Sequence, residues 1–232
     1  MVGDNENSFR PGEKPTWHDA LPLFIIWAIG VFGPFFTGVS GVAIAVMIFL
    51  YFLRMFFITG FYHRYFSHRS FQTSERGVAV MALLGCTAVQ KGPLWWAGWH
   101  RHHHRYSDQP EDAHSRTRWE HLRSRWRSFW WGMYWSHFGW IICPKFKAVN
   151  QETVPDLLES RLLCWLDRGR WHLLPAIALA LACFGLGQWL GEEWGTSGLQ
   201  MLIVGFFTST FFLAHGTFAI NSLAHWFGKK RY

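Results

Sequence analysis

The run His100-Arg101-His102-His103-His104 is the densest group of metal-ligand side chains in the sequence. Residues i, i+3 and i+4 share one face of a helix, so His100, His103 and His104 would project their rings from the same side. His102 would point elsewhere. Imidazole is the commonest protein ligand for iron, zinc and copper. The run therefore predicts one part of a metal site.

Two other segments supply further ligand-type residues. His63 and His68 are five residues apart, a spacing that is imperfect for one helical face but workable where a helix ends. Asn221 and His225 are four apart and would share a helical face. Together with His100, His103 and His104, these three histidines make six, which exceeds the four ligands of one tetrahedral zinc. Imidazoles suit iron, zinc or copper rather than magnesium or calcium, and a pair of metal ions is the economical explanation.

A pair of irons would give the site a specific chemistry. Two irons can bind oxygen and supply part of the electrons for its reduction, which permits oxidation of an unactivated C–H bond. The protein would then hold one carbon of an apolar chain beside the metals and exclude water. The acidic stretch after the histidines contains Asp108, Glu111, Asp112 and His114. It either hydrogen-bonds ligand imidazoles or forms a solvated loop.

The elements that must position these residues are membrane spans. Half of the 232 residues are apolar, with 16 Trp and 22 Phe, yet the mean hydropathy is only +0.03, and the charges are concentrated in a few stretches. A span needs roughly 20 apolar residues. Residues 21–62 hold two spans with a turn near 38–41, residues 173–191 hold a third, and a fourth runs from 198 to about 227. Residues 77–89 are too short to span and are predicted to lie at, or dip into, the membrane surface.

The distribution of charge predicts the orientation of these spans. The polar stretch 61–170 holds 16 of the 22 Lys and Arg, whereas the two short turns on the opposite side hold none. The positive-inside rule places this stretch and both termini in the cytoplasm. A helix from Gly198 to His225 would be roughly 42 Å long, against about 30 Å of hydrocarbon, so Asn221 and His225 would protrude at the same face as the other histidines.

The expected fold is therefore an all-α integral membrane protein. It has four transmembrane helices in two hairpins and a cytoplasmic helical cap that holds a di-iron site. A bacterial inner membrane and an endoplasmic reticulum would both give this topology. The net charge of +7 is attributed to a membrane surface or an acidic substrate rather than to nucleic acid. The four cysteines show no paired spacing, which predicts no disulfide.

Two features of the basic residues leave alternatives open. Arg54 is the one formal charge in 21–62, and it either snorkels to the headgroups or supports the site. The arginines between Arg116 and Arg127 either form a solvated face or grip an anionic lipid or a phosphorylated carrier.

Four motifs together resemble the integral-membrane fatty acyl desaturases, in particular the acyl-CoA delta-9 (stearoyl-CoA type) branch. His63 to His68 resembles the first box, H-x-x-x-x-H, and His100 to His104 the second, H-x-x-H-H. The segment 221–228 resembles N-S-x-A-H-x-x-G, and 136–140 resembles S-H-x-G-W. The resemblance runs from about residue 20 to the end of the chain.

This resemblance implies the roles of individual residues. Two irons, cycling between Fe2+ and Fe3+, would be bound by His63, His68, His100, His103, His104 and His225, with Asn221 acting through a water. Gln90 and Trp96 match family positions near the bend of the acyl tunnel and would contact the substrate. The remaining histidines are expected to have structural or surface roles: His18, His102, His114, His121, His137, His172 and His215. For His215 we expect a hydrogen bond to a neighbouring helix.

The resemblance also implies the reaction and its partners. The expected function is to introduce a cis double bond, at delta-9, into a saturated acyl chain with O2 as co-substrate and two electrons. The electrons would come from a separate donor, either cytochrome b5 or a ferredoxin-type protein with its reductase. The substrate would be acyl-CoA or another acyl lipid, next to membrane lipids. A lipid or alkane hydroxylase is the alternative, and a membrane metal or haem carrier is a third interpretation.

The chain departs from the family pattern in two places. The family has a third box, H-x-x-H-H, after the N-S-x-A-H segment, whereas this chain ends seven residues after His225. We therefore expect a fragment, inactive as it stands, with a flexible tail at 1–20 and a desaturase domain at 21–232 whose C-terminal part is missing. Second, animal members have an Arg-Asp pair that helps hold the CoA head group where this chain has Gly98 and Trp99. CoA, acyl carrier protein and phospholipid therefore remain possible carriers.

Overall fold

The computed structural model describes residues 13–120, 122 and 124–227, and this part of the chain is helical with no strand. The main helices are α1 (Trp17–Thr37), α2 (Gly41–Phe56), the π-helix η1 (Phe57–Ser67), α3 (Glu75–Cys86), α4 (Pro93–Tyr106), α5 (Arg125–His137), α6 (Arg161–Asp167), α7 (Leu174–Leu190), α8 (Gly198–Gln200), the π-helix η8 (Met201–Thr208) and α9 (Ser209–Trp226). Short 3-10 turns connect them: η2 (Arg116–Trp119), η3 (Gly139–Ile142), η4 (Pro144–Phe146), η5 (Gln151–Thr153), η6 (Trp171–Leu173) and η7 (Glu192–Trp194).

Four helical segments are long and apolar enough to cross a membrane: Ala20–Thr37, Gly41–Ser67, Trp171–Leu190 and Gly198–Trp226. This confirms the prediction of four such helices. The first apolar run divides at 38–40, where Gly38 has a φ of +71° and the Ser40 side chain accepts a hydrogen bond from the Ala43 N–H. Most of the predicted N-terminal tail, residues 1–12, lies outside the described residues, and α1 already begins at Trp17.

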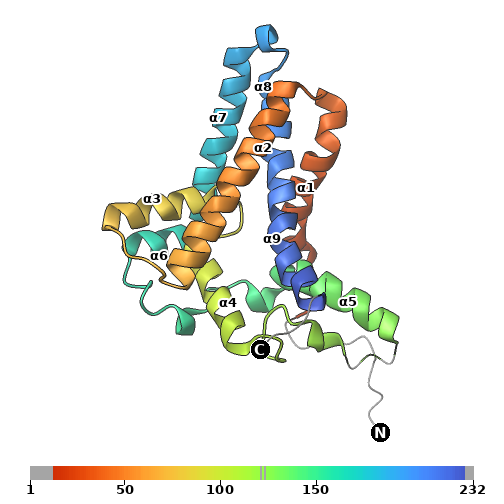
Figure 1. Cartoon of the computed structure of the whole chain (residues 1–232), viewed down its shortest axis with the longest axis vertical. Coiled ribbons are helices and arrows are strands. Elements are labelled where there is room, and N and C mark those ends of the chain that lie inside the picture. The colour runs from red at the N-terminus through yellow and green to blue at the C-terminus, as the bar shows by residue number, and fades with distance from the viewer. Residues whose placement is uncertain (1–12, 121, 123, 228–232) are drawn as a thin grey trace. The chain divides into compact units, whose positions relative to one another are not determined.

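The described chain forms two compact units. One comprises residues 23–100 and 149–214 and contains most of the apolar helices. Within it α2 and α7 both pack against η8 (Figure 1). Two glycines allow the close approach of backbones. A Cβ on Gly30 would lie 2.8 Å from the Phe207 carbonyl oxygen, and one on Gly187 of α7 would lie 2.4 Å from the Ser197 carbonyl oxygen. These helices therefore pack closely where a side chain is absent.

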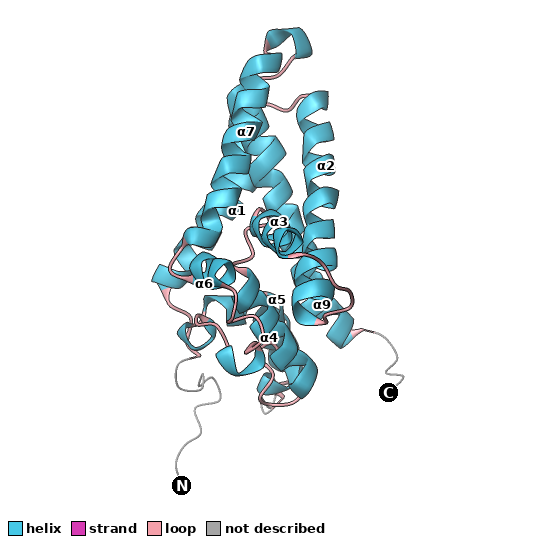
Figure 2. Ribbon diagram, turned by 90° about the vertical axis from the view of Figure 1, so that its left-hand side faces the viewer, coloured by secondary structure: helices cyan, strands magenta, loops and turns pink. Residues whose placement is uncertain are grey.

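Helix α3 differs from the four long segments. It has 12 residues, is capped by Ser74, and contacts η1 and α7. Figures 1 and 2 show it lying across the long direction of α2 and α7. This arrangement agrees with the expectation that the apolar run 77–89 does not span.

Arg54 is fully buried inside the same unit. Its guanidinium donates to Thr210 Oγ1 at 2.8 Å, Ser209 Oγ at 2.5 Å and the Thr87 carbonyl at 3.2 Å. The snorkelling interpretation is therefore wrong, because every one of these acceptors lies in the protein. Arg54 joins α2 to the beginning of α9 and to the segment after α3.

The other unit comprises residues 13–22, 101–148 and 215–227 of the described chain. Its core contains Trp135, whose indole N–H donates to the Ala113 carbonyl at 2.9 Å. Arg118 is also buried, forms an ion pair with Glu13, and lies 5.4 Å from the centre of the Trp135 ring. Arg118 is therefore not part of a solvated basic face. All four cysteines of the chain are free, as predicted.

Candidate metal centre

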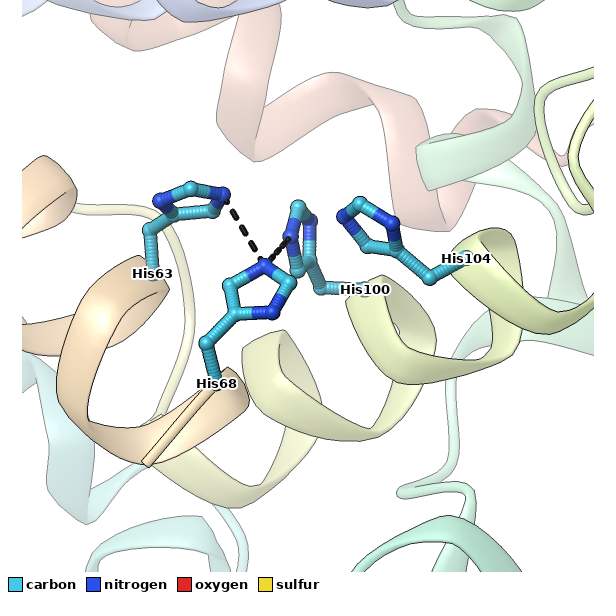
Figure 3. A group of neighbouring side chains, drawn as sticks. All are labelled: His63, His68, His100 and His104. Atoms are coloured by element: carbon cyan, nitrogen blue, oxygen red, sulfur yellow. Dashed lines mark hydrogen bonds between the residues drawn. The ribbon is translucent and has the colours of Figure 1, made fainter. Parts of the chain in front are cut away.

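Three predicted ligands meet in the unit that contains η1 and the first half of α4. The Nε2 atom of His68 lies 3.1 Å from Nε2 of His63 and 3.1 Å from Nε2 of His100 (Figure 3). Two imidazoles that share one metal ion at about 2.1 Å, at tetrahedral or right angles, have nitrogens about 3.0–3.4 Å apart. His68 Nε2 therefore lies at the spacing of two ligands of one ion from each of the other two nitrogens, and the whole group lies within 4.8 Å.

The π-helical geometry of η1 explains the spacing of His63 and His68. A π-helix places residue i+5 one turn after residue i, because its hydrogen bonds run from i+5 to i. The His68 N–H donates to the His63 carbonyl at 3.1 Å, and the Ser67 hydroxyl donates to the Tyr62 carbonyl at 2.8 Å. The two rings consequently lie in contact, with centroids 4.5 Å apart.

Asp167 fixes the start of α4. Its carboxylate accepts hydrogen bonds from the backbone N–H groups of Leu94 at 2.9 Å and Trp95 at 3.1 Å. These groups have no partner within the helix, and a negative charge is favoured at a helix N-terminus. Burial raises the pKa of Asp167 to about 6, although the two backbone hydrogen bonds oppose this. Asp167 therefore sets where α4 begins, and so where its histidines fall.

A second histidine group lies in the other unit. It consists of His103, His114 and His225, whose candidate ligand atoms all lie within 4.8 Å of one another. The ring of His103 lies 4.1 Å from that of His114 and 5.1 Å from that of His225, centroid to centroid. His103 and His225 were predicted ligands, whereas His114 was expected to have a structural or surface role.

Carboxylates hold two rings of this group. Asp112 Oδ2 lies 2.9 Å from His103 Nδ1, and Asp108 Oδ1 lies 3.2 Å from His225 Nδ1. Burial alone would raise the pKa of Asp112, but the hydrogen bond from His103 and the neighbouring imidazoles lower it overall. Of the two interpretations of the acidic stretch, hydrogen bonding to imidazoles is the one observed for these two residues. A carboxylate on one ring nitrogen fixes the tautomer and directs the other nitrogen toward a metal.

His114 is the residue of this group that sequence reasoning missed. It is 6% exposed, and its Nδ1 atom has no hydrogen-bond partner among the described residues. Burial, followed by the neighbouring His103, lowers the pKa of His114 to about 3, so the ring is neutral and able to bind a metal. The sequence signal was its position two residues after Asp112, which also accepts the His114 backbone N–H at 3.3 Å.

Helix periodicity divides the central histidine run between the two groups. Successive residues of an α-helix are rotated by about 100°, so His103 lies about 60° from His100 in one direction and His104 about 40° in the other. His100 belongs to the first group and His103 to the second. His104 is exposed and follows His100 by one turn of α4 (Figure 3). The expectation that all three rings serve one face was therefore too simple.

The two predicted substrate contacts, Gln90 and Trp96, both precede His100 in the sequence. Trp96 stacks on the His100 ring, with centroids 4.8 Å apart, and meets the His63 ring edge-on at 6.3 Å. Gln90 is half-buried in the segment between α3 and α4. Asn221 is half-buried on α9, one turn before His225. Their roles toward substrate or water remain predictions.

The remaining histidines have other partners. His102 contacts the Glu111 carbonyl at 3.0 Å and belongs to neither group. The His137 ring lies between Ser222 Oγ at 2.8 Å and His215 Nδ1 at 2.9 Å, which confirms that His215 bonds to a neighbouring helix. His121, and Gly228 of the N-S-x-A-H-x-x-G motif, lie outside the described residues.

Comparison with known proteins identifies the family of this chain. Residues 40–232 match the family model described as fatty acid desaturase. An sn-2 palmitoyl-lipid 9-desaturase of Nostoc sp. (strain 36) is 29% identical over 228 residues, 95% of this chain and 71% of the relative. An sn-1 stearoyl-lipid 9-desaturase of Anabaena variabilis is 31% identical over 223 residues, 94% of this chain and 71% of the relative. Acyl-CoA desaturase 1 of Saccharomyces cerevisiae is 26% identical over 232 residues, 95% of this chain and 42% of the relative. The chain therefore belongs to the fatty acid desaturase family.

Proposed function

We propose that this protein introduces a cis double bond at delta-9 of a saturated acyl chain, using O2 and two electrons at a di-iron centre. His63, His68 and His100 would bind one iron, with His104 adding a ligand from the same helix as His100. His103 and His225 would bind the other, with Asn221 acting through a water. The observation that supports this most directly is the position of His68 Nε2, 3.1 Å from Nε2 of His63 and 3.1 Å from Nε2 of His100.

Residues around the histidines would keep the ligands in place. When bound, two irons supply the redox chemistry that removes two hydrogens from adjacent carbons with O2. Asp112 and Asp108 hold the Nδ1 atoms of His103 and His225, which leaves Nε2 of each ring as the ligand atom. Trp96 covers one side of the His100 ring and offers an apolar surface to an acyl chain. Its proposed role is to position the chain and to exclude water.

The proposed orientation follows from charge. The four apolar helices would form two hairpins, with the basic stretch 61–170, both termini and the metal centre on the cytoplasmic side. The reaction consumes two electrons, which a separate donor of the cytochrome b5 or ferredoxin type with its reductase would supply. An exposed cytoplasmic face would allow that donor to dock.

Gly98 bears on the acyl carrier. The Thr153 hydroxyl donates to the Gly98 carbonyl at 2.9 Å, and a Cβ on Gly98 would lie 3.0 Å from the Asn150 carbonyl oxygen. The arginine that animal members have at this position would therefore not fit without moving the segment 150–153. Two of the similar proteins are named as lipid 9-desaturases. We propose a complex lipid, rather than acyl-CoA, as the preferred carrier.

The test combines metal analysis with product analysis. The intact protein, including any segment beyond residue 232, would be expressed with an electron donor, purified in detergent, and assayed with a saturated acyl lipid and with the matching acyl-CoA. We expect about two irons per chain, an alkene product, and faster turnover of the lipid. A His68→Ala variant should lose iron and activity, whereas His102→Ala should retain both. A hydroxylated product without an alkene would favour the hydroxylase alternative, and bound haem or zinc without turnover would favour a carrier.

A further inference from the structure

We infer that His114 is a metal ligand, the third imidazole of the group formed with His103 and His225. This inference rests on the proposed metal centre and adds a residue to it. None of the motifs that identify the family includes His114, because it lies ten residues beyond the second histidine box.

The environment of His114 indicates a ligand rather than a packing residue. The ring is buried, and its Nδ1 atom is enclosed with no hydrogen-bond partner among the described residues. An unsatisfied buried polar atom destabilises the folded state, and native proteins contain few of them. A metal ion would satisfy this nitrogen. A ring kept only for packing against Trp140, 5.4 Å away, would gain nothing from its nitrogen.

The arrangement of the three rings supports the same conclusion. The His103 and His225 rings each have Nδ1 next to a carboxylate, so both would bind an ion through Nε2. One nitrogen from each of the three rings lies within 4.8 Å of the other two, which allows one ion between the rings after small side-chain adjustments. His114 would bind through Nδ1, since that is its enclosed atom.

Asp112 connects two members of this group. One carboxylate oxygen lies against the His103 ring, and the other accepts the backbone N–H of His114 at 3.3 Å. The carboxylate is completely buried. The side chain that orients His103 therefore also fixes the backbone at His114, which gives the two ligands a common support.

Cobalt substitution tests the assignment without relying on enzyme activity. Purified intact protein, including any segment beyond residue 232, would be loaded with Co2+ as wild type, His114→Phe and His114→Cys, with His102→Phe and His102→Cys as matched controls. Phenylalanine keeps the ring volume but removes the ligand nitrogen. Cysteine supplies a thiolate, and a thiolate bound to Co2+ gives a near-ultraviolet charge-transfer band. The wild-type spectrum corrects for the four native cysteines.

We expect His114→Phe to bind one Co2+ fewer than wild type, or to bind its second Co2+ with a reduced affinity. The reduction should exceed the roughly 10–100-fold loss of affinity that follows from removing an outer partner of a ligand. We expect His114→Cys, but not His102→Cys, to show the thiolate band. An unchanged cobalt content in His114→Phe together with no band in His114→Cys would overturn the inference. If His114→Phe fails to fold, the band in His114→Cys decides alone. The two proposals fail separately. If the wild-type protein binds two irons and forms the alkene, but both His114 variants behave as wild type, only the ligand role of His114 is disproved. If the wild-type protein binds no iron, the proposed function is disproved.

Discussion

The Oδ2 atom of Asp112 lies 2.9 Å from Nδ1 of His103, and the carboxylate has no exposed surface. Asparagine at position 112 would keep the shape but lose the charge that orients the imidazole and raises its basicity. We expect Asp112→Asn to lower the affinity for iron by about 10–100-fold, measured by competition with a chelator. Glu111→Gln, which changes the exposed neighbouring side chain, is the control and should bind iron as wild type. Equal affinity of Asp112→Asn and wild type would show that the carboxylate does not act on a bound metal.

Asp167 predicts a dependence of stability on pH. Burial raises its pKa from 3.8 to about 6, so the folded protein holds a proton that the unfolded chain releases at lower pH. This contribution to stability is present below pH 3.8 and is lost as the pH rises through 6. Relative to wild type, Asp167→Asn should therefore become more stable between pH 4 and pH 7, by at most about 3 kcal/mol.

The measurement for Asp167 is the free energy of unfolding in detergent at several pH values. Glu159→Gln, in an exposed position nearby, should run parallel to wild type. A constant difference between Asp167→Asn and wild type over this range would contradict the raised pKa.

His137 predicts the opposite dependence on pH. Burial, with a smaller effect from His215, lowers its pKa from 6.5 to about 4. Below pH 6.5 the unfolded chain therefore takes up a proton that the folded protein does not, and stability is lost as the pH falls from 6.5 toward 4. His137→Gln should unfold with a weaker dependence on pH in this interval, measured by thermal unfolding. His18→Gln changes an exposed histidine and serves as the control, which should keep the wild-type dependence of unfolding on pH. A wild-type dependence in His137→Gln as well would contradict the prediction.

Arg54 should matter more for stability than its single charge suggests. Its guanidinium bonds to Ser209, Thr210 and the Thr87 carbonyl inside the protein. Arg54→Ala would leave these groups without their donor and create a cavity, so we expect a loss on the order of 3 kcal/mol in the free energy of unfolding. Arg64→Ala, at an exposed position on the same continuous helix, should change it by less than about 0.5 kcal/mol. Similar values for the two variants would disprove the role assigned to Arg54.

Two glycines of α7 offer a matched pair of variants. A Cβ on Gly187 would lie 2.4 Å from the Ser197 carbonyl oxygen, whereas a Cβ on Gly185 would meet nothing within 4 Å. Gly187→Ala should destabilise the protein by about 1–3 kcal/mol, because the backbone at Ser197 must move. Gly185→Ala should be neutral, or stabilising by up to about 1 kcal/mol through helix propensity. Thermal unfolding of both variants distinguishes close backbone packing from a simple effect of composition.

The helices and most of the candidate ligands could be predicted from the sequence because both leave simple patterns. Apolar runs of about 20 residues report membrane-spanning helices directly. Histidines at short fixed spacings report a shared surface, and His63, His68 and His100 do lie together. The carboxylates that contact His103 and His225 could also be predicted from the sequence, because they closely follow the histidine run.

The remaining features depend on packing between segments that are distant in sequence. His114 is distinguished by its burial and by the His103 and His225 rings beside it, and neither feature is visible in a local sequence pattern. Apart from the Leu50 carbonyl one turn earlier, the partners of Arg54 lie 33 to 156 residues away, so its inward direction could not be predicted from the sequence around it. The division of His100 and His103 between two groups follows from their different partners, which α-helical spacing alone does not name.

The π-helix at Phe57–Ser67 has a consequence for how this protein can evolve. A π-helix holds about one residue more per turn than an α-helix, so its length is part of its specification. Deleting one residue between His63 and His68 would restore α-helical spacing but would rotate everything on one side of the deletion by about 100°. Substitutions in this stretch can be absorbed one side chain at a time, whereas a change in length cannot. Over evolutionary time the residues of this segment should therefore vary in identity, while the number of residues in it stays constant.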